Sequence, residues 1–129
     1  MRISAKSSTI NRYFMSDIQE LTNLIIKFRN ARDWKKFHNP KDTSLSLVLE
    51  ATEVMEHFQW KNEKEIQVYL KTHKIELGEE LSDVLYWVLL MSHDLDIDIV
   101  QAFKNKMAVS SKKYPVNKAK GNHKKYTEL

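Results

Sequence analysis

Glu50-Ala-Thr-Glu53 and Glu80-Leu-Ser-Asp83 are two acidic motifs, and each lies within a largely apolar stretch of the 129-residue chain. Both stretches are long, lack proline and do not alternate between apolar and polar residues as strands do, so both are predicted to be helices. Carboxylates three residues apart lie on one face of a helix. We therefore expect two acidic ridges, one formed by Glu50 and Glu53 and the other by Glu80 and Asp83.

The first ridge is bordered by apolar residues, including Leu47, Leu49 and Val54, and no lysine or arginine is close to either ridge on its own helix. A helix that is apolar nearly all round is normally buried. Buried carboxylates must be paired, bind a metal or take up protons. Because Mg²⁺ prefers hard oxygen ligands, we predict that both ridges together bind Mg²⁺ and present it to a polyphosphate. The alternative is that these are exposed carboxylates that pair with lysines elsewhere.

A di-iron carboxylate bundle is a rival interpretation of the same residues. Such sites take a Glu from each of two helices and a Glu-x-x-His motif from each of the other two. The sequence contains no Glu-x-x-His: His57 follows Glu53 by four residues, and His73 precedes Glu76. The di-iron interpretation is therefore disfavoured.

Composition bounds the class of protein. A chain of 129 residues with 42% hydrophobic and 29% charged residues is typical of one globular domain. The chain has only two glycines and two prolines, and this scarcity favours long helices. It has no cysteine, which excludes disulfides and is compatible with a reducing cytoplasm. Residues 1–14 lack the apolar region of a signal peptide, and Val84–Met91 is too short to span a membrane. We expect a cytoplasmic protein with no membrane partner.

The predicted organisation is a loosely ordered arm (1–15), an all-α, four-helix-bundle-like domain (16–114) and a basic C-terminal tail (115–129). The first helix is expected from Ile18 to about Arg32 after a Ser16 cap, and the second from a cap at Asp42 or Thr43 to near Trp60. A short helix is expected to start at the possible capping box Asn62–Glu65. The third main helix is expected from about Ile75 to His93, and the fourth from a cap at Asp96 or Asp98 to just before Tyr114.

Aromatic residues flank both acidic motifs. Trp34 and Phe37 precede the first motif, Trp60 follows it, and Trp87 lies one turn beyond Asp83. Their rings could stack on a nucleobase, although packing in a core is the more common role of tryptophan. His38 could donate a hydrogen bond to a base or phosphate, or make only a local bond in its loop.

The C-terminal tail is basic, with six lysines and no acidic residue between Lys112 and Lys125. These lysines could reach the phosphates of a substrate, or they could form a solvated segment with weak affinity for nucleic acid. Aromatic residues among them are sparse, so we expect no dedicated nucleic-acid surface.

An ordered set of motifs resembles the dCTP pyrophosphatase branch of the MazG-like all-α nucleoside triphosphate pyrophosphohydrolases. The similarity covers nearly everything from Ile18 onward. The motifs are Arg32-Asp33-Trp34-Lys35-Lys36-Phe37-His38-Asn39-Pro40, Glu50-x-x-Glu53, Phe58-Gln59-Trp60-Lys61, Glu79-Glu80-Leu81-Ser82-Asp83-Val84-Leu85, Lys113-Tyr114-Pro115 and Lys125-Tyr126-Thr127-Glu128-Leu129.

The resemblance implies an Mg²⁺-dependent enzyme that hydrolyses a (deoxy)nucleoside triphosphate, such as dCTP or modified dCTP, to the monophosphate and pyrophosphate, and so cleans the nucleotide pool. It implies an oligomer, expected to be a homotetramer, with pockets between subunits. A non-enzymatic helical nucleotide-binding or assembly protein with this fold is the alternative. The implied metal ligands are Glu50, Glu53, Glu80 and Asp83, with Glu50 or Glu53 as general base, and the implied nucleotide pocket is lined by Trp34, Phe37, His38 and Trp60.

Two positions depart from the family pattern. Trp87 stands where relatives commonly have tyrosine, and we expect it to contact the base or sugar. Ser110 stands where relatives tend to carry asparagine, so a phosphate or sugar contact is expected to differ there.

Overall fold

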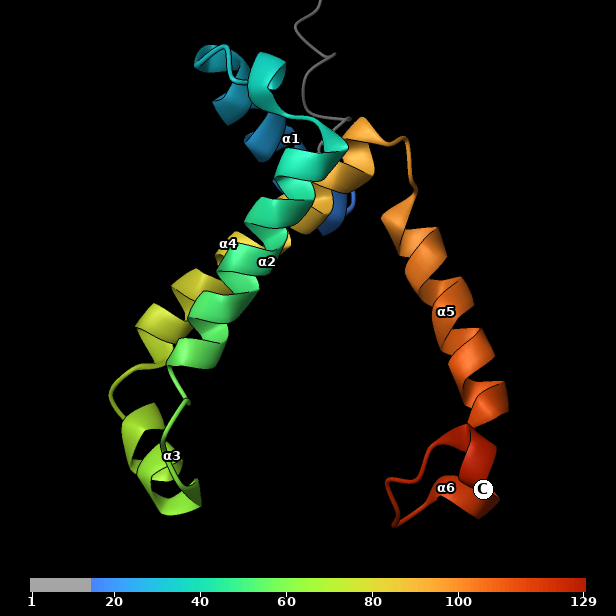
Figure 1. Ribbon diagram of the computed structural model, residues 1–129. Helices are drawn as coiled ribbons and strands as arrows, with labels where there is room; N and C mark the ends of the chain where they lie inside the picture. The colour runs from blue at the N-terminus through green and yellow to red at the C-terminus, as the bar shows by residue number, and fades with distance from the viewer. Residues whose placement is uncertain (1–14) are drawn as a thin grey trace, which may run out of the picture. The chain divides into compact units, whose positions relative to one another are not determined.

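The computed structural model describes residues 15–129, and these are helical with no strand (Figure 1). The all-α prediction is confirmed. The arm predicted for residues 1–15 lies, except for Met15, outside the described residues. The elements are α1 (Asp17–Ala31), η2 (Lys35–Phe37), α2 (Pro40–Glu56), α3 (Glu63–Leu70), α4 (Lys74–Asp94), α5 (Ile99–Lys113), α6 (Val116–Ala119) and η3 (Tyr126–Glu128).

Three helices begin where local sequence signals predicted. The hydroxyl of Ser16 accepts a hydrogen bond from the Gln19 amide and caps α1. Asn62 and Glu65 form the predicted capping box of α3. The side chain of Asp98 caps α5. Each cap satisfies backbone N–H groups that have no partner within the helix.

The start and end of α2 differ from the prediction. The cap is Asn39, whose side-chain oxygen accepts from the Asp42 amide at 3.0 Å, and not Asp42 or Thr43. Pro40 then occupies the first turn, where its missing N–H costs nothing. The helix ends at Glu56 instead of near Trp60, which has a φ of 68° in the left-handed region.

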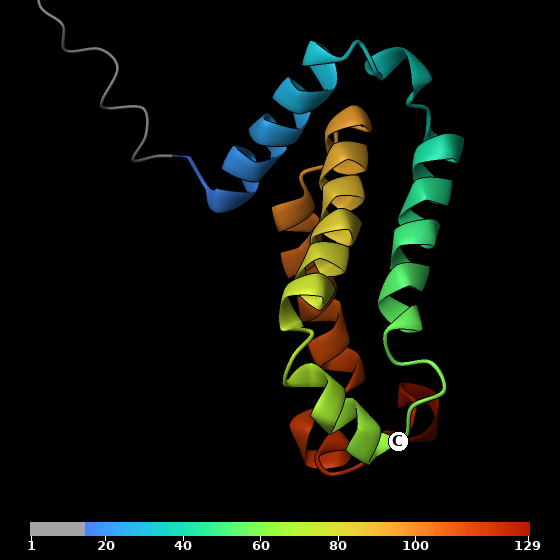
Figure 2. The same ribbon diagram turned by 90° about the vertical axis from the view of Figure 1, so that its left-hand side faces the viewer.

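The chain divides into two compact units, the first ending at Leu95 and the second beginning at Asp96. In the first unit α4 packs against both α1 and α2 and lies between them in Figure 2. The buried apolar residues at this contact are Ile25, Leu89 and Leu90. The second unit contains α5 and the predicted basic tail, which carries α6 and η3.

Helix α2 is far more exposed than its apolar sequence predicts. Thr43 is its only buried residue. Four of its apolar side chains are exposed, namely Leu45, Val48, Leu49 and Met55. The expectation that α2 is buried nearly all round is therefore not met within one chain, and its acidic ridge is open to solvent on one side.

Among the described helices, none combines the length and apolar character needed to cross a bilayer.

Candidate metal centre and aromatic pocket

The packing of α2 against α4 brings three carboxylates together. Glu50 comes from α2, and Glu80 and Asp83 come from α4. Each offers one oxygen atom, and these three atoms all lie within 4.8 Å of one another. Glu50 and Glu80 are half-buried and Asp83 is exposed, so the cluster is open on one side. Hard oxygen donors at this spacing suit a divalent cation such as Mg²⁺, and the cluster could bind a metal ion.

Glu53 adds a fourth carboxyl group to this cluster. A hydrogen bond with Glu53 is the largest cause that raises the pKa of Glu80, followed by burial and by the Glu53 charge. Burial is the largest cause that raises the pKa of Glu50, followed by the charges of Asp83 and Glu53. Like charges at close range disfavour ionisation. The two ridges therefore form one charge cluster that a cation would stabilise.

Two side chains next to the cluster lower the pKa of one of its carboxyl groups, Trp87 that of Glu50 and His57 that of Glu80. Trp87 donates a hydrogen bond that lowers the pKa of Glu50, although burial outweighs it. His57 places Nε2 3.7 Å from Oε1 of Glu80. The sequence interpretation assigned His57 no role in the site. Its position one turn after Glu53, on the face of the ridge, is the signal that could have identified it.

The raised pKa of Glu50 gives a pH-dependent stability with a defined sign. Because the folded-state pKa exceeds its ordinary value of 4.5, the ionised side chain destabilises the metal-free fold at pH 7.5. This penalty falls as the pH drops through the raised pKa and is lost below the ordinary value. Glu50→Gln is always neutral, so it is expected to unfold at a higher temperature than the wild type at pH 7.5 in chelator.

The matching measurement is a series of thermal unfolding scans of both proteins between pH 7.5 and pH 4.5. The difference between the two melting temperatures should shrink as the pH falls. A difference that stays constant over this range would show that the Glu50 charge is not the cause.

An aromatic pocket adjoins the acidic cluster. The cavity has a volume of about 490 Å³, and its lining residues are Phe28, Trp34, Glu50, Asp83, Tyr86 and Trp87. The rings of Phe28 and Trp34 meet edge to face with centroids 5.7 Å apart, and those of Tyr86 and Trp87 do so at 5.0 Å. A small-molecule site is commonly of this size, with apolar walls and a few polar groups.

Two of the predicted aromatic residues, Trp34 and Trp87, thus share a pocket with two of the predicted ligands. Phe28 and Tyr86 also line it but were not predicted as site residues. Phe28 lies within the first predicted helix, and no motif singled it out. Tyr86 lies three residues after Asp83, and this spacing could have placed it on the same face.

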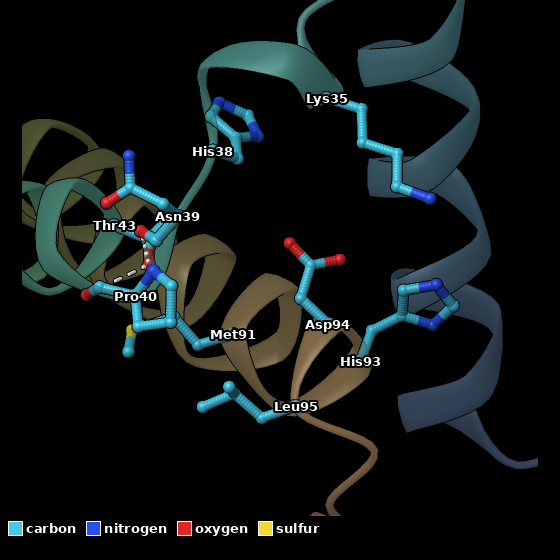
Figure 3. Close-up of a pocket in the computed structure, with 9 residues that line it drawn as sticks. All are labelled: Lys35, His38, Asn39, Pro40, Thr43, Met91, His93, Asp94 and Leu95. Carbon is cyan, nitrogen blue, oxygen red and sulfur yellow. Dashed lines mark hydrogen bonds between the residues drawn. The ribbon is translucent and has the colours of Figure 1, made fainter.

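His38 lines a different cavity of about 330 Å³, together with Lys35, Asn39, Pro40, Thr43, Met91, His93, Asp94 and Leu95. Figure 3 shows its imidazole across this cavity from the carboxylate of Asp94. Burial, followed by the charge of Arg29, lowers the pKa of His38. Its ring also meets that of Trp87 edge to face, with centroids 5.5 Å apart. His38 therefore packs against Trp87, which lines the aromatic pocket, but does not line that pocket itself.

Phe37 and Trp60 do not line the aromatic pocket. Phe37 is exposed in η2, with Lys36 Nζ 5.3 Å from its ring. Trp60 is 92% exposed, just after α2. Within one chain the structure therefore gathers Glu50, Asp83, Trp34 and Trp87 around one cavity but leaves Trp60 in solvent.

The combination of helical packing, a carboxylate cluster and an adjoining aromatic pocket defines a class of helical proteins that could bind a metal together with an aromatic small molecule. Residues 45–129 match the MazG-like family. The chain belongs to this family, and the family membership stated from the sequence is confirmed.

Individual relatives agree with this assignment. The chain is 36% identical to dCTP pyrophosphatase 1 of Mus musculus over 114 residues, which cover 87% of this chain and 67% of that protein. It is 35% identical to dCTP pyrophosphatase 1 of Homo sapiens over the same shares. The crystal structure of a pyrophosphatase from Archaeoglobus fulgidus is similar with a TM-score of 0.73 and 35% identity, covering 78% of this chain and 94% of that one.

Proposed function

We propose that this protein is a Mg²⁺-dependent nucleoside triphosphate pyrophosphohydrolase of the cytoplasm that acts on dCTP or modified dCTP and so cleans the nucleotide pool. The observation that carries the proposal is the opening of a carboxylate cluster into an aromatic pocket. The names of the relatives, dCTP pyrophosphatase 1 and pyrophosphatase, support both the reaction and the base. The catalytic part is the helical domain of residues 16–114.

The metal ligands in this proposal are Glu50, Glu53, Glu80 and Asp83. Their donor chemistry fits Mg²⁺, because three of them offer hard oxygens within 4.8 Å of one another and no lysine or arginine neutralises them in the described chain. When bound, Mg²⁺ would neutralise charge on the triphosphate and make a bound water more acidic.

Glu53 is also the proposed general base, through a carboxylate oxygen that is not engaged with the metal. It is exposed and lies outside the three-oxygen cluster, yet it is close enough to raise the pKa of Glu80. Its carboxylate would accept the proton of a water whose oxygen attacks the α-phosphorus. The bond from the α-phosphorus to the bridging oxygen then breaks, and pyrophosphate leaves.

Hydrolysis of dCTP in H₂¹⁸O tests this bond assignment. Attack at the α-phosphorus places the label in dCMP and leaves pyrophosphate unlabelled. Mass spectra that show label in pyrophosphate, or dCDP with free phosphate as products, would contradict the proposal.

The nucleobase is proposed to stack in the aromatic pocket between Trp34 and Trp87, with Phe37, His38 and Trp60 as further substrate contacts. Stacking of a base on an aromatic ring contributes about 1–3 kcal/mol. Trp34→Ala is therefore expected to raise KM for dCTP by about 5- to 150-fold with a smaller change in kcat. Trp34→Phe keeps a flat ring and is the matched control, for which KM should stay near the wild-type value. Equal KM values for the alanine variant and the wild type would remove Trp34 from the site.

A homotetramer is the proposed assembly. The exposed apolar side chains of α2 have no partner in the described chain, and burying apolar surface contributes about 25 cal/mol per Å². A neighbouring subunit would cover this face, and Trp60 would contribute to the pocket of that copy.

Sedimentation velocity checks the assembly. The wild type is expected at four times the 15.3 kDa of one chain. Leu49→Asp, at a residue 63% exposed on α2, should shift the protein to smaller species, whereas Lys41→Glu on the same helix should not. A wild-type protein that sediments as a single chain would contradict the proposed tetramer.

A further inference from the structure

His57 links α3 to the carboxylate cluster, and no step of the proposed reaction uses it. It follows directly after α2, and its side chain is only 13% exposed. Its Nε2 is 3.7 Å from Oε1 of Glu80 on α4, and its Nδ1 is 2.6 Å from the hydroxyl of Tyr69 on α3. The imidazole therefore has one nitrogen toward a proposed metal ligand and the other toward a short helix outside the site.

The hydroxyl of Tyr69 favours a proton on the nitrogen that faces Glu80. When the hydroxyl donates to Nδ1 of a neutral ring, the proton of the imidazole is on Nε2. When the ring is doubly protonated, Nε2 carries a proton as well. The remaining form is the neutral ring with its proton on Nδ1. It would direct the lone pair of Nε2 at a carboxylate, which is electrostatically unfavourable. Both favourable forms direct an N–H toward Oε1 of Glu80.

Tyr69 is itself held in place. Its ring is stacked on the imidazole of His73, with centroids 3.8 Å apart and an interplanar angle of 6°. Lys61 Nζ lies over the same ring at 4.4 Å from its centroid. Stacking and a cation near the ring restrict the motion of the tyrosine, so its hydroxyl is a fixed partner for His57.

We propose that His57, oriented by Tyr69, is a positioning residue that fixes the Glu80 carboxylate for metal binding. The proposal rests on the metal site proposed above. An N–H directed at Oε1 from 3.7 Å attracts the carboxylate and restrains it, so less conformational freedom would be lost when Glu80 binds a metal. The short helix α3 thereby contributes to the affinity of a site that it does not contact.

Binding of Mn²⁺ to the full-length protein without nucleotide tests this role, with free Mn²⁺ measured by electron paramagnetic resonance. His57→Leu keeps an apolar side chain of similar bulk but has no donor, and it is expected to raise the Mn²⁺ dissociation constant about tenfold. His57→Gln retains an N–H donor and should recover part of that loss. The control is His93→Leu, an exposed histidine on α4 outside the cluster, which should bind Mn²⁺ like the wild type.

Tyr69→Phe separates positioning from a merely structural role, because it keeps the stacked ring and removes only the hydroxyl. It should raise the Mn²⁺ dissociation constant about threefold in the wild-type background. This increase is smaller than the one expected for His57→Leu, because Tyr69 does not contact the metal ligand itself. In the His57→Leu background it should have no effect, because Tyr69 acts through His57. Tyr69→Phe also keeps the proposal testable if His57→Leu fails to fold.

The outcomes separate the two proposals. A wild-type protein that binds no Mn²⁺, or a Glu80→Gln variant that binds it like the wild type, would overturn the metal site and the role of His57 with it. Normal wild-type binding, with unchanged constants in folded His57→Leu and Tyr69→Phe, would overturn the role of His57 alone. Equal effects of Tyr69→Phe in both backgrounds would also overturn it.

Discussion

Glu50→Gln is expected to lower the rate of dCTP hydrolysis by about 10²- to 10³-fold, the scale of a lost group that stabilises charge in a transition state. Glu50 is the one residue of α2 whose oxygen joins those of Glu80 and Asp83 within 4.8 Å. Glutamine keeps the size of the side chain but replaces an anionic ligand by a neutral amide. Metal affinity and charge compensation on the triphosphate should both fall. Steady-state release of pyrophosphate at saturating Mg²⁺ measures the effect.

Glu56→Gln is the matched control, because it makes the same change on the same helix at an exposed residue outside the cluster. Its rate should stay within twofold of the wild type (an order-of-magnitude bound for a surface change). The Glu50→Gln protein should also remain folded, since removal of a like charge relieves repulsion. Wild-type turnover by a folded Glu50→Gln variant would exclude Glu50 as a metal ligand.

Asp94→Ala is expected to lower the free energy of unfolding by about 3–5 kcal/mol. The carboxylate of Asp94 accepts two hydrogen bonds from Arg29, at 2.6 and 2.9 Å, and these join the end of α4 to α1. The side chain of Arg29 is only 1% exposed. Removing its partner leaves a buried, uncompensated charge, which costs far more than the net contribution of an ion pair. Urea unfolding at a fixed protein concentration measures the loss.

Two comparisons make this stability test specific. Lys36→Ala breaks an exposed pair with Asp33, 2.8 Å long, and should cost less than about 1 kcal/mol. The double replacement Arg29→Met with Asp94→Ala removes the buried charge and should recover much of the loss. A loss below about 1 kcal/mol for Asp94→Ala alone would show that Arg29 finds solvent or another partner.

Local sequence signals predicted the helices well because their causes are local. Apolar spacing and cap residues such as Ser16 and Asp98 act within one or two turns. Where several candidate caps were close together, as before α2, spacing alone selected Asp42 or Thr43, and only the contact with the Asp42 amide identifies Asn39 as the cap. The make-up of each acidic ridge was also predictable, since its two residues are three apart on one helix.

Contacts between helices were not predictable from one sequence in the same way. Phe28 and Tyr86 come from α1 and α4, and only the packing of these helices brings them to the aromatic pocket. The contact between His57 and Tyr69 depends on how α3 folds back after α2. A nearly all-apolar sequence predicts that a helix is buried, but it does not show which neighbour covers it, and within one chain the leucines Leu45 and Leu49 of α2 are exposed.

Pyrophosphate release by the purified protein, with a panel of canonical and 5-substituted (deoxy)nucleoside triphosphates, is the most direct test of the central claim. Each substrate is assayed with Mg²⁺ and with an excess of chelator. The expected result is release that requires Mg²⁺ and is fastest with dCTP or a 5-substituted dCTP. Absence of release from every triphosphate by a folded protein, or release that persists in chelator, would contradict the proposed enzyme.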